Sequence, residues 1–288
     1  MELVFVVSRE MDGMCLRDFL RNQGVSATLI KAVKYKTNGF WMDGKPVRTC
    51  DAVIVGQRVR FSLPPEQDTT VEAEDIPCTI VYESDHVMVL EKPAGMAVHP
   101  TLNYTNGTLA NAYMGLLEKR GEKGVFRPVN RLDKDTSGLV LCAKNAYAAP
   151  ILAASAKKIY RAILGGVLPS PQGVIEAPIA RAEDSIILRR VHPDGKPSRT
   201  EYQQEAVTQQ ELSLVAAKPV TGRTHQLRVH FAHMGCPLEG DELYGGKRDR
   251  IHRHALHCSE MWFTEPATGQ TVWLTSSLPP DMQALLDE

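Results

Sequence analysis

The chain has 288 residues, of which 43% are hydrophobic and 23% are charged, and its formal net charge at pH 7 is −1. This length suits two domains, and the hydrophobic fraction is ordinary for a protein with a buried core. No apolar run approaches the roughly 20 residues that span a bilayer, and Met1-Glu2-Leu3-Val4 lacks the basic-then-apolar pattern of a signal peptide. We therefore expect a cytoplasmic protein without membrane contact.

Cysteine and histidine spacings do not indicate a metal site. The six cysteines are scattered with no Cys-x-x-Cys pair, which predicts reduced thiols. His225, His230 and His233 match no common zinc spacing. We expect neither a metal nor another cofactor.

The first 63 residues predict a small α/β domain. Apolar residues recur with helical spacing in two short segments that Gly24 separates, and an Asp-Gly turn between apolar runs predicts a hairpin. A final strand follows the hairpin. The predicted helices lie at 16–20 and 26–34, the hairpin at 40–47 and the strand at 56–61.

Charge changes sharply at the end of this domain. Lys and Arg outnumber Asp and Glu through residue 63, whereas residues 64–91 contain acids and no Lys or Arg. Pro64-Pro65 opens an acidic, weakly periodic stretch, so we predict a linker over 64–76. The near-neutral total charge argues against RNA binding, but a local basic face can coexist with it.

Residues 77–288 predict an α+β domain around a largely antiparallel sheet, because strand-like and helical runs alternate irregularly. No internal repeat is evident in this region. The strand-like runs lie at 79–90, 138–143, 158–168, 212–218 and 271–275, and the helical runs at 106–119, 145–157 and 224–234.

The most informative segment is Arg131-Leu132-Asp133-Lys134-Asp135-Thr136-Ser137-Gly138. We predict a polar turn that Gly138 closes, followed by a strand. Two acids and two cations within five residues exceed what a turn requires, although a solvated charged hairpin would contain the same residue types. A loop between rigid elements holds its side chains fixed and reachable, which suits catalysis.

Three further segments carry candidate site residues. Lys92 opens a Lys-Pro-Ala-Gly turn after an apolar strand, and Tyr160 lies in a strand where a Tyr would ordinarily be core. The third segment is Thr221-Gly222-Arg223-Thr224-His225-Gln226-Leu227-Arg228. There we predict Thr224 as the N-cap of a helix that Gly235 terminates.

In their order and spacing, these four segments resemble the RluA-type pseudouridine synthases, over residues from about 76 to the end. The resemblance implies the pseudouridine synthase fold and the isomerisation of uridine to pseudouridine in RNA. It further implies that Asp133 acts on the nucleoside, that Arg228 pairs with this acid and that Tyr160 stacks on the uracil. Arg131 corresponds to the residue that supports base extrusion. Other candidate contacts to the substrate or RNA are Lys92, Asn130, Arg223 and His225.

The isomerisation breaks the N1–C1′ bond, turns the uracil and joins C5 to C1′, so nothing is oxidised or hydrolysed. It needs an ionised carboxylate in a pocket that excludes water. A guanidinium beside Asp133 would keep that acid charged at neutral pH, which suits Arg228. Asp133 could add to the sugar or the base, or remove the C2′ proton. A base or a water near Tyr160 could receive the C5 proton after the uracil has turned.

Residues 1–63 resemble the S4-like RNA-binding domain in the order of their predicted elements more than in residue identity, so a small structural cap is an alternative. If this domain binds RNA, Lys31 and Lys34 on its second helix are the predicted phosphate contacts. An RNA-binding appendage favours ribosomal RNA as the substrate, with transfer RNA still open. We expect the protein to be a monomer.

Asn130 stands before the catalytic loop where many relatives carry His, and Asn cannot carry a proton. This departure keeps open a non-catalytic RNA-binding or ribosome-assembly protein built on a synthase scaffold. A nucleoside hydrolase with Asp135 as a second carboxylate is a third alternative. The joint presence of the acid, the Tyr and the Arg named above favours the enzyme, because a binding protein has no chemical need for this set.

Overall fold

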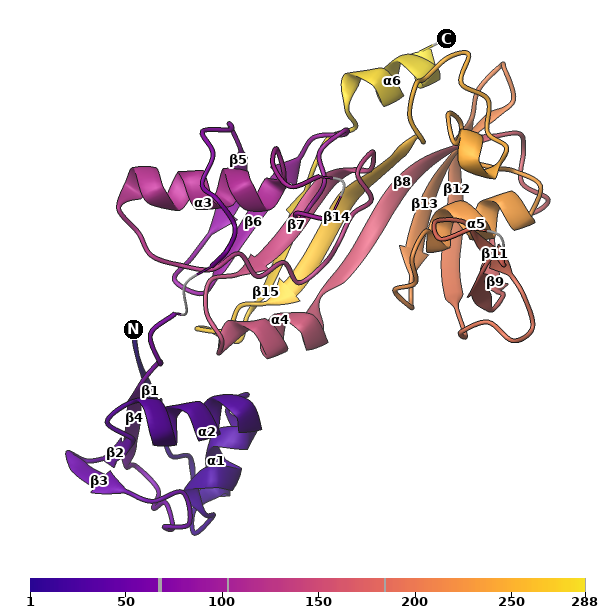
Figure 1. The fold of residues 1–288 in the computed structure, drawn as a ribbon. Helices are drawn as coiled ribbons and strands as arrows, with labels where there is room; N and C mark the ends of the chain where they lie inside the picture. The colour runs from indigo at the N-terminus through magenta and orange to yellow at the C-terminus, as the bar shows by residue number, and fades with distance from the viewer. Residues whose placement is uncertain (67–68, 103, 184, 288) are drawn as a thin grey trace.

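The N-terminal part of the chain folds around a four-stranded antiparallel sheet with strand order β1-β4-β2-β3 (Figure 1). The structure is a computed structural model and describes residues 1–66, 69–102, 104–183 and 185–287. Two helices pack on this sheet and share its apolar core. The elements are β1 (Glu2–Val6), η1 (Arg9–Met11), α1 (Leu16–Asn22), α2 (Ala27–Lys36), β2 (Phe40–Met42), β3 (Lys45–Val47) and β4 (Arg58–Ser62).

Both predicted helices and the predicted hairpin are confirmed in this part. Asp43 and Gly44 form the hairpin turn with φ angles of 46° and 80°, the left-handed geometry typical of an Asp-Gly turn. Ser26 caps α2 by accepting the N–H of Leu29 at 3.1 Å. Strand β1 was not predicted, because it is defined by pairing with β4, a partner distant in sequence.

A nine-stranded sheet forms the centre of the larger part, within the described residues. Its order is β5-β6-β7-β14-β8-β13-β12-β9, with β15 beside β14, and every pair is antiparallel except β7 with β14. The predicted α+β domain with a largely antiparallel sheet is therefore confirmed. The strands are β5 (Thr79–Glu83), β6 (Val87–Lys92), β7 (Ser137–Ala143), β8 (Lys157–Gly165), β9 (Gln172–Glu176), β12 (Arg199–Val207), β13 (Leu212–Pro219), β14 (Leu256–Thr264) and β15 (Thr271–Thr275).

Helices flank this sheet, and a small hairpin lies near its β9 end (Figure 1). The run predicted as one strand at 79–90 is two strands, because Ser84 Oγ accepts the N–H groups of His86 and Val87 and turns the chain. Within the described residues, none of the helices has the length and apolar character to span a bilayer. The remaining elements are α3 (Leu109–Arg120), α4 (Ala148–Ser155), β10 (Ile179–Arg181), β11 (Arg189–Val191), α5 (Gln226–His233), η2 (Glu242–Tyr244) and α6 (Pro280–Asp287).

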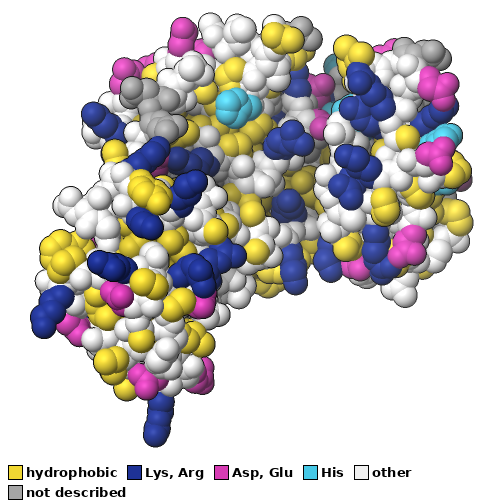
Figure 2. Space-filling view, turned by 60° about the horizontal axis from the view of Figure 1, so that its bottom comes forward, with side chains coloured by type: hydrophobic (Ala, Val, Ile, Leu, Met, Phe, Trp, Pro, Cys, Tyr) yellow, Lys and Arg dark blue, Asp and Glu magenta, His cyan; other side chains and the backbone are white. Residues whose placement is uncertain are grey.

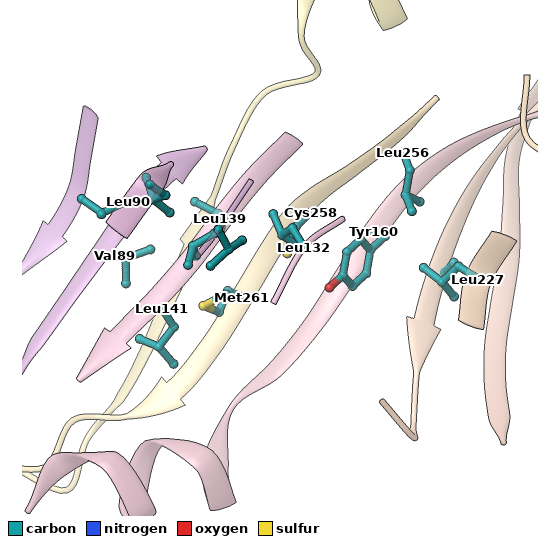
Figure 3. Close-up of a cluster of buried hydrophobic side chains, with 14 of the residues drawn as sticks. Val89, Leu90, Leu132, Leu139, Leu141, Tyr160, Leu227, Leu256, Cys258 and Met261 are labelled. Atoms are coloured by element: carbon teal, nitrogen blue, oxygen red, sulfur yellow. The ribbon is translucent and has the colours of Figure 1, made fainter. Parts of the chain in front are cut away.

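Strand β7 lies in the middle of the core and is buried at every residue. Leu139 and Leu141 of β7 share one apolar cluster with Val89 and Leu90 of β6 and Met261 of β14 (Figure 3). Burial on both faces explains why β7 reads as a continuous apolar run and not as an alternating one. The loop that precedes β7 therefore has a rigid base.

Gly138 does not close that loop as predicted, but lies inside β7. Its φ is 109°, and a Cβ at this position would stand 2.3 Å from the carbonyl oxygen of Cys258 on the parallel strand β14. The two strands can approach this closely only because Gly138 has no side chain.

We expect Gly138→Ala to destabilise the protein by about 3 kcal/mol or more, because the added methyl group meets backbone that cannot move without parting two core strands. Gly269→Ala is the matched control. Gly269 also has a positive φ, of 70°, but nothing lies within 4 Å of its Cβ position, so this change should cost only about 1 kcal/mol. Urea unfolding of both variants measures the difference, and equal losses would contradict the close approach of β7 and β14.

The N-terminal part is held against α4. Tyr147, which precedes this helix, and Ile151 within it pack into the apolar core of the small sheet. The hydroxyl of Tyr147 donates to the carbonyl of Gln23 at 3.2 Å, and its ring meets Phe5 edge-on. The two parts therefore share a packed interface.

The stretch predicted as a linker lies along α3, with residues 67 and 68 outside the described residues. The side chain of Asn111 donates to the carbonyl of Glu72 at 2.9 Å, and the N–H of Glu74 donates to the carbonyl of Asn111 at 3.1 Å. The carbonyl oxygen of Glu74 lies over Gly115, where a Cβ would stand 1.9 Å away. This segment is tied to α3 and does not hang free.

Candidate active site

The loop before β7, the start of β8, the end of β13 and the start of α5 enclose a cavity of about 760 Å³. Its lining carries more basic than acidic side chains, which attracts a polyanion even though the whole chain is near neutral. Figure 2 shows Lys and Arg side chains gathered on one face of the molecule, over the N-terminal part and beside the hollow near its centre. The Lys and Arg residues in the lining are Arg131, Lys157, Lys158, Lys218, Arg223 and Arg228, and the Asp and Glu residues are Asp133 and Glu201.

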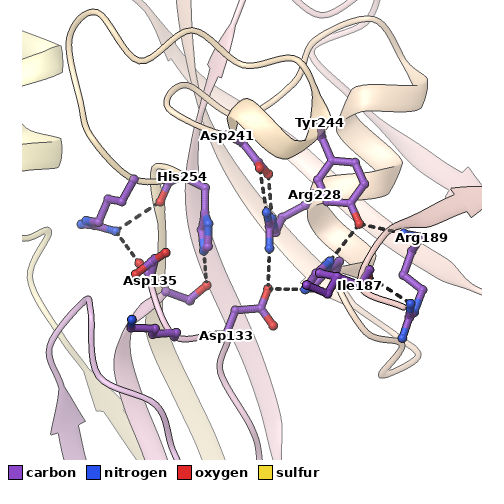
Figure 4. Close-up of polar contacts among 12 residues, drawn as sticks. Asp133, Asp135, Ile187, Arg189, Arg228, Asp241, Tyr244 and His254 are labelled. Carbon is purple, nitrogen blue, oxygen red and sulfur yellow. Dashed lines mark hydrogen bonds and ion pairs between the residues drawn. The ribbon is translucent and has the colours of Figure 1, made fainter. Parts of the chain in front are cut away.

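Asp133 lies in the loop before β7, and about 30% of its side chain is exposed. Two donors approach the same carboxylate oxygen (Figure 4): Arg228 Nη1 is 3.3 Å from Oδ2, and His225 Nε2 is 3.8 Å from it. Within the described residues, Oδ1 of Asp133 has no such partner. Oδ1 is therefore the oxygen that a substrate in the cavity can meet.

Arg228 has a second and closer acid partner, Asp241, which was not predicted. Its Nε and Nη2 donate to the two carboxylate oxygens of Asp241, each at 2.7 Å, and the Asp241 side chain is only 1% exposed. Burial by itself lowers the pKa of Arg228, but Asp241, followed by Asp133, raises the pKa above its usual value. Arg228 is thus permanently charged, and its forked contact with Asp241 fixes its direction.

Helix α5 begins at Gln226, and the prediction of Thr224 as its N-cap is wrong. His225 precedes the helix with a φ of 55° and makes no side-chain cap. The side chain of Gln226 folds back instead, and its Oε1 accepts the N–H of Arg223 at 3.0 Å. A left-handed backbone is uncommon for residues other than Gly, although His adopts it more often than most. Here it coincides with an imidazole that faces Asp133.

Tyr160 of β8 lies in the cavity wall near Leu132 (Figure 3), with 7% of its surface exposed. Burial raises the pKa of its hydroxyl well above the ordinary value. The phenol therefore stays protonated at neutral pH and cannot itself act as a base. Its flat apolar ring lines the cavity, and stacking on the uracil, the role that the family resemblance implies, stays a prediction.

Lys92 is wholly buried, so the prediction that it contacts RNA is wrong for this arrangement. Its Nζ donates to the carbonyls of Pro93, Met96 and Lys134 at 2.8, 2.7 and 2.9 Å. Burial lowers the pKa of Lys92 to about 7, yet three carbonyl acceptors match the three N–H bonds of an ammonium group. Lys92 ties the turn after β6 to the loop that carries Asp133.

Asn130 lines the cavity but is only 4% exposed, and both ends of its amide are occupied. Its Nδ2 donates to the carbonyl of Leu139 at 3.1 Å, and its Oδ1 accepts the N–H of Leu141 at 2.8 Å. The predicted contact to RNA is thus not open to these polar atoms. The departure from the His of many relatives concerns how the loop is anchored to β7.

Four of the other predicted RNA contacts are exposed, and their roles stay predictions. Arg131 and Arg223 line the cavity, and Arg223 Nε donates to the carbonyl of Pro197 at 3.2 Å. Lys31 and Lys34 lie on the exposed side of α2 in the N-terminal part.

Two buried histidines hold the end of the loop that carries Asp133. The hydroxyl of Thr136 bonds to His254 Nε2 at 2.7 Å, and that of Ser137 bonds to His257 Nδ1 at 2.9 Å. Burial lowers the pKa of His254 to about 2 and that of His257 to about 4. Both rings are therefore neutral at pH 7.

We expect the free energy of unfolding to fall as the pH drops from about 6.5 toward 4, because His254 and His257 take up protons in the unfolded chain while the native rings stay neutral. At pH 5 each ring accounts for a loss of roughly 2 kcal/mol. Urea unfolding at pH 7 and pH 5 measures this loss, and His257→Asn should reduce it. Equal stability at the two pH values would contradict the buried, neutral histidines.

The model of the RNA pseudouridylate synthase family matches residues 86–233, just over half of the chain. The chain belongs to this family. The match includes the loop of Asp133 and the start of α5, which form the cavity. The fold is thus the pseudouridine synthase fold, and the protein is an RNA pseudouridine synthase, an isomerase.

Two relatives match most of the synthase. It is 34% identical over 279 residues to the uncharacterized RNA pseudouridine synthase YjbO of Bacillus subtilis, covering 95% of this chain and 98% of the relative. It is 33% identical over 270 residues to the ribosomal large subunit pseudouridine synthase D of Xanthomonas campestris, covering 87% and 81%. A solved structure, human RNA pseudouridylate synthase domain containing 1, matches with a TM-score of 0.59 and 26% identity over 76% of this chain and 90% of that one.

Proposed function

We propose that this synthase modifies specific uridines in structured ribosomal RNA, with Asp133 as its catalytic carboxylate. The observation that carries the proposal is the convergence of Asp133, Arg228 and Tyr160 on one cavity whose charged lining residues are mainly basic. A carboxylate, a fixed guanidinium and a flat ring are the groups that the isomerisation requires. An RNA backbone is the polyanion that such a lining attracts.

In the proposed reaction, a uridine enters the cavity and its uracil stacks on Tyr160. Oδ1 of Asp133 meets the nucleoside, while Arg228 holds Oδ2 and keeps the carboxylate in one orientation. The N1–C1′ bond breaks, the uracil turns, C5 bonds to C1′ and the C5 proton leaves. Because the phenol of Tyr160 is protonated, that proton passes to solvent or to another base.

Base extrusion is assigned to Arg131, which is exposed at the cavity. A uridine that leaves its stack opens a gap in the RNA, and a planar guanidinium can enter that gap and stack on the neighbouring bases. This contact offsets part of the few kcal/mol that unstacking costs.

Ribosomal RNA is favoured over transfer RNA for two reasons. The relative from Xanthomonas campestris is a ribosomal large subunit pseudouridine synthase, and this chain covers 81% of it. The N-terminal part adds exposed Lys31 and Lys34, which suit phosphate contacts outside the cavity. A substrate with structure around the target uridine can reach both surfaces.

The hydrolase alternative is disfavoured by the position of Asp135. This residue is not in the cavity lining. Its backbone carbonyl accepts from Arg253 Nη1 at 3.2 Å. A glycosidic hydrolase with two carboxylates needs both acids beside the scissile bond, and Asp135 does not meet that need.

Pseudouridine mapping of total RNA from cells with and without this gene tests the proposal. We expect one or a few ribosomal RNA sites to disappear on deletion and to return when the gene is restored. Loss of transfer RNA sites alone would contradict the substrate assignment. If no site changes, and the purified protein leaves the same RNA unmodified, the binding-scaffold alternative replaces the proposal.

A further inference from the structure

Tyr244 of η2 holds His225 in one of its two neutral forms. The Tyr244 hydroxyl lies 2.8 Å from His225 Nδ1 and accepts the backbone N–H of Arg189 at 3.1 Å (Figure 4). The hydroxyl proton therefore needs an acceptor, and among the described residues the one in contact is His225 Nδ1. The hydroxyl donates to Nδ1, so Nδ1 carries no proton.

His225 is neutral at physiological pH. Burial lowers its pKa, and Asp133 offsets this effect only in part. A neutral imidazole whose Nδ1 is an acceptor carries its proton on Nε2. Other charged or titratable groups lie close enough to act on the ring. They are Asp133 in the catalytic loop, Arg228 on α5, Asp241 and Tyr244 at η2, Arg189 on β11, and His254 before β14.

His225 lines the cavity, and within the described residues its Nε2 has no hydrogen-bond partner. Its distance of 3.8 Å from Asp133 Oδ2 is too long for a hydrogen bond. A protonated imidazole would instead form an ion pair with the carboxylate and would take the hydroxyl of Tyr244 as an acceptor only. The arrangement therefore provides a neutral donor beside an ionised acid.

We propose that Tyr244 is a positioning residue that fixes the Nε2–H tautomer of His225, and that this N–H donates a hydrogen bond to the uracil while the base is detached. The inference rests on the proposed function. When the N1–C1′ bond breaks, its electron pair leaves with the uracil, and the negative charge spreads over N1 and the carbonyl oxygens. The N–H of Nε2 stabilises that charge by hydrogen bonding, and no proton leaves the imidazole.

The tautomer can be observed without any turnover. In the full-length protein labelled with ¹⁵N-histidine, NMR at pH 7 should show Nδ1 of His225 as the unprotonated nitrogen, with the signals assigned by their absence in His225→Gln. In Tyr244→Phe, protonation of Nδ1 should become detectable. The ring should also titrate at higher pH, because Nδ1 no longer accepts the hydrogen bond that favours the neutral imidazole. A proton on Nδ1 in the natural protein would overturn the proposal.

Kinetic measurements then distinguish a positioning role of Tyr244 from a purely structural one. The assay is single-turnover tritium release from a ribosomal RNA transcript carrying [5-³H]uridine. Tyr244→Phe should slow the reaction about ten-fold, and the acid limb of its pH profile should move to higher pH. His225→Ala should slow it by about 100-fold or more. His225→Gln supplies an amide N–H and should recover part of the rate.

Tyr82→Phe is the matched control, since the Tyr82 hydroxyl bonds to Glu265 at 3.1 Å and does not line the cavity. This variant should match the natural protein in both experiments. If Tyr244→Phe slows the reaction but keeps the natural tautomer and the natural acid limb, the positioning role is wrong. A natural protein without activity on any RNA would contradict the proposed function instead, because the NMR result does not depend on turnover.

Discussion

Asp133→Asn should abolish isomerisation and leave the fold intact. Asn keeps the shape of the side chain but carries no negative charge, so the rate should fall on the order of 10⁴-fold or more. Stability should change little, because Arg228 keeps its bidentate partner Asp241 and no buried charge is left alone. Single-turnover tritium release measures the rate, and thermal unfolding measures the stability.

Asp135→Asn is the control for this experiment. Asp135 stands two residues away in the same loop but does not line the cavity. This variant should keep most of the activity. An Asp135→Asn protein as inactive as Asp133→Asn would indicate two essential carboxylates, and an active Asp133→Asn protein would remove Asp133 from its proposed role.

Asp241→Asn should damage both stability and catalysis. Among the described residues, it leaves the buried Arg228 with only Asp133, at 3.3 Å, as an acidic partner. Removing one member of a buried ion pair typically costs about 3 kcal/mol or more. Without the bidentate contact to Asp241, Arg228 can turn toward Asp133. A displacement of about 1 Å at a reaction centre can slow the rate about 100-fold.

Asp75→Asn provides the comparison for stability. Asp75 forms an ion pair with Lys119, and both side chains are largely exposed. Loss of that pair should cost less than about 1 kcal/mol. Urea unfolding of the two variants, together with tritium release, tests the expectation. If Asp241→Asn were as stable and as active as Asp75→Asn, Asp241 would not be what holds Arg228.

The acid, the guanidinium and the ring proposed for the site were predicted because each lies in a contiguous motif that resembles the RluA-type synthases. Asp133, Tyr160 and Arg228 are distant in sequence but meet at one cavity, and the strand and helix periods around them were strong enough to predict the sheet and α5. The turn at Asp43 and Gly44 was predictable for the same reason, since local backbone chemistry decides it.

Contacts made across the fold could not be predicted in this way. Asp241 and Tyr244 orient Arg228 and His225 from thirteen and nineteen positions away, and no spacing rule links them. Lys92 was predicted to contact the substrate or RNA, because the sequence does not reveal that three backbone carbonyls surround it.

The prediction for Gly138 was wrong for a related reason. Gly138 suggested the end of a turn, whereas its role comes from the backbone of β14, which arrives from the far end of the chain. Tertiary contacts, and not local propensity, decided each of these positions.

The packing of Tyr147 and Ile151 against the N-terminal part has a consequence for substrate choice. The N-terminal part packs against α4, and the segment around Glu74 is hydrogen-bonded to α3. The exposed lysines of α2 therefore lie at a fixed distance from the cavity. An RNA that touches both must carry its target uridine at a matching span from the second contact. If Lys31 and Lys34 bind the RNA as proposed, the synthase should modify only uridines that lie at the matching distance from this second contact.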